Sequence, residues 1–260
     1  MRPILIATRG FELRCAAVCA GIGALAALLY LRSCRQRLGL NLEVFWALAL
    51  ALVLGVFAGG IVAYAALYGP GLAANLGRLA HGQVAGGSFF GVFWGAIVAA
   101  FIFCRLRGLA FAPIRDCLGI AAALGLVFIR LGCLLNGCCY GRPTERPWGI
   151  VFRDPACRVP RDLLGVPLHP TQLYEMGGAA MIFLLLRWAV VPQVERESLR
   201  AGSAFLLFVA FYAILRFAED FCRASDPGLI TLAGLTTAQL LCVLTFSGAA
   251  GVWLSRRRVR

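Results

Sequence analysis

Lysine is absent from the sequence, so every basic side chain that could bind an anion is an arginine. Acidic residues are also few, because 12 Asp and Glu stand against 25 arginines, which gives a formal net charge of +13. Histidine occurs only at His81 and His169, which leaves little imidazole for acid–base chemistry. We find no internal repeat, low-complexity run or break in composition, and we therefore expect one domain.

Apolar residues dominate the chain, of which 61% is hydrophobic and only 14% charged. They come in blocks of about 20 rather than in alternation, which is typical of a polytopic membrane protein. The arginines gather between these blocks, where they orient helices and meet anionic lipid head groups. We therefore expect the membrane as a partner and no binding of nucleic acid.

Seven apolar blocks are long enough to cross a hydrocarbon core, which takes about 20 helical residues. They cover residues 15–31, 43–68, 86–104, 117–135, 171–191, 202–218 and 235–254. We predict an all-α, polytopic membrane protein of about seven transmembrane helices, forming a single integral membrane domain over 1–260. The first block lacks a small-residue cleavage site, so we interpret it as a retained span.

The distribution of arginine predicts the orientation of these spans. Arginines are dense in the short connections after the first, third and fifth blocks and in the tail at 256–260, as is typical of cytoplasmic segments. We therefore predict an outer N-terminus and an inner C-terminus. The longest connection, about 136–169, then lies on the outer face, and its five prolines predict an irregular loop. Long connections of this kind commonly carry function.

Arg130 lies near the end of the fourth block. An ionised arginine costs about 2.5 to 3.5 kcal/mol at the centre of a membrane helix, so it normally faces a polar cavity or an anion. The alternative is an arginine at a helix end whose guanidinium reaches the membrane surface.

The stretch HPTQLYE, residues 169–175, opens the fifth block. Pro170 suits the first turn of a helix, and Gln172 and Glu175 are three apart, so they share a helix face. The alternative to a binding site is a polar helix cap, with Tyr174 in the belt of aromatic residues at the level of the lipid head groups.

Arginine and glutamate also alternate where the sixth block closes. Arg216 and Glu219 are three apart and Arg223 lies one turn further. They form either a structural ion pair or an anion clamp, since the planar guanidinium suits phosphate. Elsewhere, Gly86 and Gly87 give the third block a start of small residues, which allows close helix packing or close approach of a lipid.

Four cysteines flank or occupy the long loop, at Cys133, Cys138, Cys139 and Cys157. Their spacing differs from the paired C-x₂-C motifs of zinc sites, and His169 is the one imidazole nearby, so we expect no metal. A disulfide among them is favoured if the loop faces an oxidising compartment, and a reactive thiol is a further alternative.

Taken together, these segments resemble the bacterial prolipoprotein diacylglyceryl transferase family. The stretch 130–144 is similar to the family pattern R-x-G-N-x-x-N-G-E-x-x-G-R-x-T, HPTQLYE matches H-P-[ST]-Q-L-Y-E, and RFAEDFCRASD resembles R-F-x-x-E-x-x-R-x-x-D. GLTTAQLLCV, from Gly234, is similar to the opening of the family's last span. Three departures stand out. Where the family has G-G-x-S-x-H-G this chain reads GGSFFG, so Phe90 stands in place of the histidine. Cys133 stands in place of an asparagine and Cys138 in place of a glutamate.

The resemblance implies a function and roles for individual residues. The diacylglyceryl group of phosphatidylglycerol would pass to the lipobox cysteine of a prolipoprotein signal peptide, in the inner membrane of a bacterium and without a cofactor. The alternatives are transfer of a lipid group to another acceptor and a non-catalytic lipid-binding or redox role. Residues implied in catalysis are Arg130, Arg216, Glu219 and His169. Residues implied in substrate binding are Asn136, Gly137, Gly141, Arg142, Gln172, Tyr174, Glu175, Arg223, Gly86 and Gly87.

Overall fold

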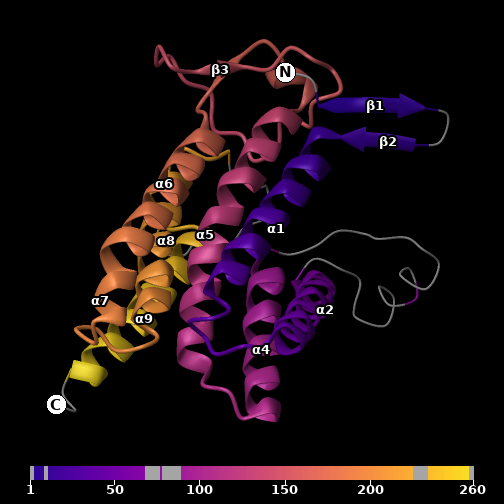
Figure 1. Ribbon diagram of the computed structural model, residues 1–260. Coiled ribbons are helices and arrows are strands. Elements are labelled where there is room, and N and C mark those ends of the chain that lie inside the picture. Colours follow the sequence, from indigo (N-terminus) through magenta and orange to yellow (C-terminus); the bar gives the residue numbers. More distant parts are fainter. Residues whose placement is uncertain (1–2, 9–10, 68–76, 78–88, 225–233, 258–260) are drawn as a thin grey trace. The chain divides into compact units, whose positions relative to one another are not determined.

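The computed structural model describes residues 3–8, 11–67, 77, 89–224 and 234–257, and each predicted apolar block coincides with helix in it (Figure 1). The helices are α1 (Cys15–Cys34), α2 (Leu42–Leu67), α4 (Phe89–Arg107), α5 (Phe111–Asn136), α6 (Thr171–Leu185), α7 (Val191–Glu195), α8 (Ser203–Asp220) and α9 (Thr237–Arg257). A π-helical turn, η2 (Leu186–Val190), joins α6 to α7. It lies directly before Pro192, which lacks the amide hydrogen that a regular helical turn would use.

Five helices in the described part of the chain are long and apolar enough to cross a membrane: Cys15–Cys34, Leu42–Tyr64, Phe111–Asn136, Thr171–Glu195 and Thr237–Arg256. Large apolar side chains on several of them are exposed, among them Leu54, Phe57, Trp188 and Leu244. Exposure of this kind fits helices whose outer surface faces lipid. The chain is therefore a predominantly helical, polytopic membrane protein, as the sequence predicts.

The structure divides into two compact units, residues 31–118 and residues 1–30 with 119–260. Within the first unit, α2 packs against α4 through glycines from both helices. A Cβ atom on Gly95 would lie 2.2 Å from the Gly55 carbonyl oxygen, and one on Gly91 would lie 2.1 Å from that of Gly59. These glycines allow close backbone approach, so small residues here serve helix packing. Gly86 and Gly87 lie outside the described residues.

In the second unit, α8 contacts both α6 and α9 (Figure 1). The unit also holds a hairpin of β1 (Ile4–Thr8) and β2 (Phe11–Arg14), with Thr8 opposite Phe11. No strand was predicted for these residues. The short apolar run at Ile4–Thr8 is too brief for a reliable pattern.

The connection from α5 to α6 contains β3 (Ile150–Val151), the 3₁₀ turn η1 (Arg161–Leu163) and β4 (Pro167–Leu168), and β3 pairs with β4. Phe152, Cys157, Val159 and Leu168 form a small buried core beneath them. The two short sheets are small additions to the all-α architecture that the sequence predicts. The loop is irregular, as expected, but its apolar side chains hold it together.

Candidate functional site

A buried ion pair joins α5 to α6. Arg130 Nη2 donates to Glu175 Oε1 at 2.8 Å, and Arg130 Nε lies 2.8 Å from Glu175 Oε2. Arg130 is 8% exposed and Glu175 is fully buried, so both charges are almost completely withdrawn from solvent. Removing one partner of such a pair leaves an uncompensated buried charge. The guanidinium is therefore enclosed by protein and paired with a carboxylate.

Tyr212 on α8 adds a third group to this pair. Its hydroxyl donates to Glu175 Oε1 at 2.8 Å, so the Glu175 carboxylate links α6 to both α5 and α8. The sequence analysis missed Tyr212. It lies one helical turn before Arg216, and a tyrosine at that spacing in an apolar helix was the available signal.

The end of α8 carries a second group of charges. Arg216 Nη1 lies 2.8 Å from Asp220 Oδ1 and 3.7 Å from Glu219 Oε2. Arg223 Nη1 donates to Glu219 Oε1 at 3.3 Å. The two contacts of Arg216 follow from helical spacing of three and four residues, whereas Arg223 lies three residues beyond the end of α8. The predicted Arg216–Glu219 neighbourhood is therefore present, with Asp220 as the nearer acid.

Asp220 in turn connects α8 to α9. The Thr236 hydroxyl donates to Asp220 Oδ2, while the Thr236 amide donates to Gln239 Oε1 at 2.9 Å and the Gln239 amide donates to Thr236 Oγ1 at 3.1 Å. This reciprocal pair is a capping box that begins α9. Asp220 was also missed, although it occupies the glutamate position of R-F-x-x-E counted from Arg216.

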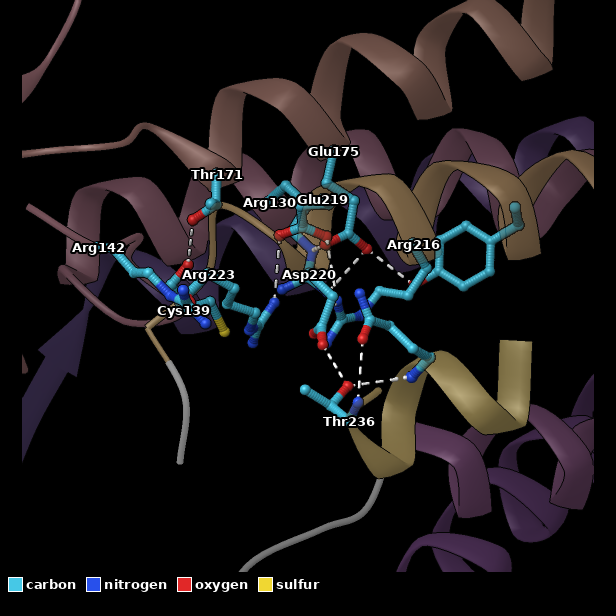
Figure 2. A network of polar contacts seen from close by, with 12 residues as sticks. Arg130, Cys139, Arg142, Thr171, Glu175, Arg216, Glu219, Asp220, Arg223 and Thr236 are labelled. Atoms are coloured by element: carbon cyan, nitrogen blue, oxygen red, sulfur yellow. Dashed lines mark hydrogen bonds and ion pairs between the residues drawn. The ribbon is translucent and has the colours of Figure 1, made fainter. Parts of the chain in front are cut away.

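Figure 2 shows these charged side chains as one polar network, with Arg130, Glu175 and Glu219 next to one another and Arg216 beside them. Both predicted arginines therefore belong to one constellation. Each is nevertheless paired with carboxylates of its own, which the sequence analysis did not foresee for Asp220.

The loop is joined to the end of α8 through Gly141 and Arg142. The Gly141 amide donates to the His169 carbonyl at 3.1 Å, and the Arg142 amide donates to the Cys222 carbonyl at 2.8 Å. A Cβ on Gly141 would lie 2.5 Å from that of His169 and 2.7 Å from the Cys222 oxygen, so only glycine fits. The Arg142 side chain binds the Arg223 carbonyl at 3.0 Å.

A Schellman turn ends α5 just after Asn136. Gly137 has a φ of +68°, its amide donates to the Leu134 carbonyl at 3.3 Å, and the Cys138 amide donates to the Cys133 carbonyl at 3.1 Å. Asn136 is buried, and its Oδ1 accepts a hydrogen bond from Arg14 at 3.4 Å. Gly137 is therefore explained by backbone conformation, whatever part it has in binding.

Two residues that open α6 support the loop. Gln172 Nε2 donates to the Cys138 carbonyl at 2.8 Å, and Thr171 Oγ1 donates to the Cys139 carbonyl at 2.7 Å. Among the described residues, Gln172 Oε1 is buried without a hydrogen-bond partner. HPTQLYE therefore does more than cap a helix, because its side chains fix both the loop and Arg130.

His169 and Tyr174 form a separate group. The His169 Nδ1 lies 3.2 Å from the Tyr174 hydroxyl, which also accepts a 2.7 Å hydrogen bond from Trp148 Nε1. These contacts tie the imidazole to α6 and the loop rather than to Arg130. A role of His169 as a base stays a prediction.

The eleven cysteines all lie in described parts of the chain, and all are free thiols. The sulfurs of Cys133, Cys138 and Cys139 lie within 4.8 Å of one another, whereas Cys157 is buried in the loop core. Hydrogen bonds from the Cys133 and Cys138 thiols lower the pKa of Cys139 well below the ordinary value, and the charges of Arg223 and Arg130 also lower it. The structure thus has a cluster of three thiols, and no disulfide joins the four cysteines that flank or occupy the loop.

Known proteins resemble the chain along most of its length. Residues 3–255 match the family model described as prolipoprotein diacylglyceryl transferase. The chain belongs to this family. A phosphatidylglycerol–prolipoprotein diacylglyceryl transferase of Solidesulfovibrio magneticus is 36% identical over 214 residues, which cover 80% of this chain and 75% of the relative. Proteins of the same name from Geobacter sulfurreducens and Anaplasma marginale are 34% and 32% identical, and each alignment covers 92% of this chain and 89% or 82% of the relative.

The chain is a transferase of this family, and besides Asp220 it departs at three positions from the family patterns given above. Phe90 lies in the first turn of α4, and Cys133 and Cys138 lie at the two ends of the Schellman turn. Two of the three positions thus belong to the thiol cluster, beside Arg130, whose Nη1 lies 3.8 Å from the Cys133 sulfur.

Proposed function

We propose that the chain transfers the diacylglyceryl group of phosphatidylglycerol to the lipobox cysteine thiol of a prolipoprotein signal peptide. The thiol sulfur attacks the glyceryl carbon that carries the phosphodiester oxygen, this carbon–oxygen bond breaks, and glycerol phosphate leaves with the electron pair. The observation that supports this most strongly is the buried Arg130, held by Glu175 inside a helix long enough to span a membrane.

The leaving group requires positive charge. Glycerol phosphate is an anion, and cations fixed in a water-poor site stabilise the charge that grows on it in the transition state. Arg130 and Arg216 are our candidates for this role, and Arg223 adds a third guanidinium to the same network. The planar guanidinium can hold two phosphate oxygens at once.

The carboxylates of the network do not neutralise all of its guanidinium groups, so a phosphate can bind there as a counter-ion. Glu175 and Glu219 lie next to each other (Figure 2), and two neighbouring carboxylates repel each other unless one carries a proton. If the two glutamates share one proton, they carry one negative charge together, and Asp220 carries a second. Three guanidinium groups then give the network one excess positive charge. The remaining positive charge would be neutralised by one lipid phosphate.

Residues around the network would hold the head group. Asn136 and Gln172 are both buried, and Gln172 Oε1 is an acceptor that a glycerol hydroxyl could use. Gly137 and Gly141 would let the loop backbone approach the head group, and Arg142 and Tyr174 would contact it from the loop and from the start of α6. Gly86 and Gly87 stay candidates for the passage of acyl chains. Removing the proton from the substrate thiol would be the task of Glu219, Glu175 or His169.

The orientation proposed from the arginines suits this function. With seven spans, the N-terminus outside and the C-terminus inside the bacterial inner membrane, the end of α5, the start of α6 and the end of α8 all lie toward the outer face. Arg130, Glu175 and Arg216 are on these segments. A signal peptide emerging on that side would present its lipobox to them.

A mass measurement tests the transfer. The purified protein is incubated with phosphatidylglycerol and a lipobox peptide, and we expect the peptide to gain the mass of one diacylglyceryl unit. A peptide with serine in place of the cysteine and a membrane of phosphatidylcholine are the controls that should give no gain. No gain with any lipobox peptide, while the Geobacter sulfurreducens relative is active in the same assay, would overturn the proposal.

A further inference from the structure

The three-thiol cluster is built by the end of α5. The Schellman turn returns the chain so that the Cys138 amide binds the Cys133 carbonyl at 3.1 Å, which brings residues five apart in sequence next to each other. Cys139 has a φ of +58°, a conformation that is uncommon for any residue except glycine. The positive φ of Gly137 and that of Cys139 together place three sulfurs within 4.8 Å of one another.

Side chains from α6 hold this turn in place. Gln172 and Thr171, both buried, donate hydrogen bonds of 2.8 and 2.7 Å to the carbonyl groups of Cys138 and Cys139. The thiols therefore sit on a backbone fixed from two helices rather than on a free loop. Support of this kind is what a preorganised ligand set requires.

We propose that Cys133, Cys138 and Cys139 bind a zinc ion and leave its fourth coordination position open. Thiolates are preferred ligands of zinc, and catalytic zinc sites combine three protein ligands with one exchangeable position. Zinc–sulfur bonds of about 2.3 Å in a tetrahedral site put sulfurs about 3.8 Å apart. The sulfurs of the cluster, within 4.8 Å of one another, reach this separation by small side-chain movements.

The surrounding charges fit a site of this kind. Three thiolates and one Zn²⁺ carry a net charge of −1, and two guanidinium groups lie near. Arg130 Nη1 is 3.8 Å from the Cys133 sulfur, in position to donate a hydrogen bond to this ligand, and Figure 2 shows Cys139 beside Arg223. Hydrogen bonds to ligand atoms orient them and tune the metal.

The open position suits the lipobox thiol, an inference that rests on the proposed function. The substrate thiol binds zinc as a thiolate and releases its proton to water. Its sulfur then attacks the glyceryl carbon of phosphatidylglycerol, the carbon–oxygen bond breaks, and glycerol phosphate departs with the bonding electrons while the thioether leaves the metal. Zinc would thus lower the pKa of the substrate thiol. A histidine at position 90 could accept the thiol proton, but the Phe90 side chain cannot.

Metal content tests the site independently of catalysis. We expect the full-length protein, after treatment with a chelator, to take up one Zn²⁺ per chain. Changing any one of the three cysteines to serine should weaken zinc binding by more than about 100-fold, since even loss of a supporting group around a metal costs about 10- to 100-fold. Cys222→Ser, outside the cluster, is the matched control that should bind as the wild type does.

Two results would overturn the site. One is zinc uptake by the wild type no stronger than by Cys138→Ser. The other is recovery of a disulfide between cysteines of the cluster from protein prepared without reductant, with no zinc bound. Because serine differs from cysteine by one atom, each variant should fold, and its thermal unfolding confirms this before metal is measured.

Cobalt substitution tests the open position. Co²⁺ bound by thiolates absorbs visible light, and we expect this spectrum to change when a lipobox peptide is added but not when its cysteine is replaced by serine. An unchanged spectrum would contradict substrate binding to the metal. A changed spectrum without thioether formation in zinc-loaded protein would leave the site standing and refute the proposed transfer. Transfer that survives complete zinc removal would refute the metal's role in an active transferase.

Discussion

Arg130 is the residue on which the proposed chemistry depends most. Its guanidinium has two contacts of 2.8 Å to Glu175 and is 8% exposed, so its position is fixed before any lipid binds. A cation held in this way does not have to reorganise when charge develops on a leaving group.

Substitution of Arg130 should reduce transfer more than binding of the peptide. We expect Arg130→Ala to lower the rate by about 10² to 10³, the cost of losing one preorganised group at a developing charge. Arg130→Lys should be intermediate, because it keeps the charge but loses the planar fork. Mass analysis of the lipobox peptide measures both rates, with Arg153→Lys, an exposed loop residue, as the control. Full activity of Arg130→Ala would rule out its role.

Glu175 should matter for stability as well as for activity. We expect Glu175→Leu to lower the free energy of unfolding by about 3 to 5 kcal/mol, because it leaves the Arg130 charge buried and unpaired. The double variant Arg130→Leu with Glu175→Leu should be clearly more stable than the single one. Thermal unfolding in detergent compares the two, and equal losses would show that the unpaired charge is not the cause.

At the scale of elements, neighbouring glycines on α6 have different surroundings. A Cβ on Gly178 would lie 2.4 Å from Leu215 Cδ1 of α8, whereas a Cβ on Gly177 has nothing within 4 Å. Substitutions at these two glycines therefore distinguish the effect of helix–helix packing from that of helix propensity.

Alanine at these two positions should have opposite effects. We expect Gly178→Ala to destabilise the protein by about 1 to 3 kcal/mol through overpacking against α8. Gly177→Ala should be neutral or stabilising by up to about 1 kcal/mol, because alanine is the better helix former. The difference in unfolding midpoint measures this, and equal midpoints would contradict the observed packing of α6 on α8.

The sequence identified helices well and turns poorly. Runs of apolar residues mark every long helix, but they begin α5 at residue 117 although it begins at Phe111. The sequence drew attention to the cysteines around the loop, but the spacing C-x₄-C-C did not indicate that Cys133, Cys138 and Cys139 would form one cluster. Only the backbone of the Schellman turn, with positive φ at Gly137 and Cys139, brings those sulfurs together.

At the scale of the whole molecule, the family patterns pointed to the residues of the candidate site but not to the contacts between their side chains. Arg130, Glu175 and Arg216 were all found from sequence. The contact of Tyr212 with Glu175 depends on how α6 and α8 pack, which no single helix encodes. The contact of Arg216 with Asp220 is different, because the two residues are four apart within α8 and helical spacing alone predicts it.

The orientation of the chain is a prediction for intact cells. We expect a protease tag inserted at Gly165, an exposed loop position, to be cut from outside in spheroplasts, because the loop should face outward. The same tag at the C-terminus should be protected until the membrane is opened, since the arginine-rich tail favours the cytoplasm. The reverse pattern of cleavage would place the Arg130 network on the wrong side for the proposed substrates.

The most direct test of the account is the stoichiometry of the reaction. Phosphatidylglycerol labelled in its glycerol phosphate head group is incubated with a lipobox peptide and the purified protein, and both products are counted. We predict one glycerol phosphate released for each thioether formed, with both lost together in Arg130→Ala. Thioether without glycerol phosphate, or head-group release without thioether, would contradict a displacement at the glyceryl carbon supported by these arginines.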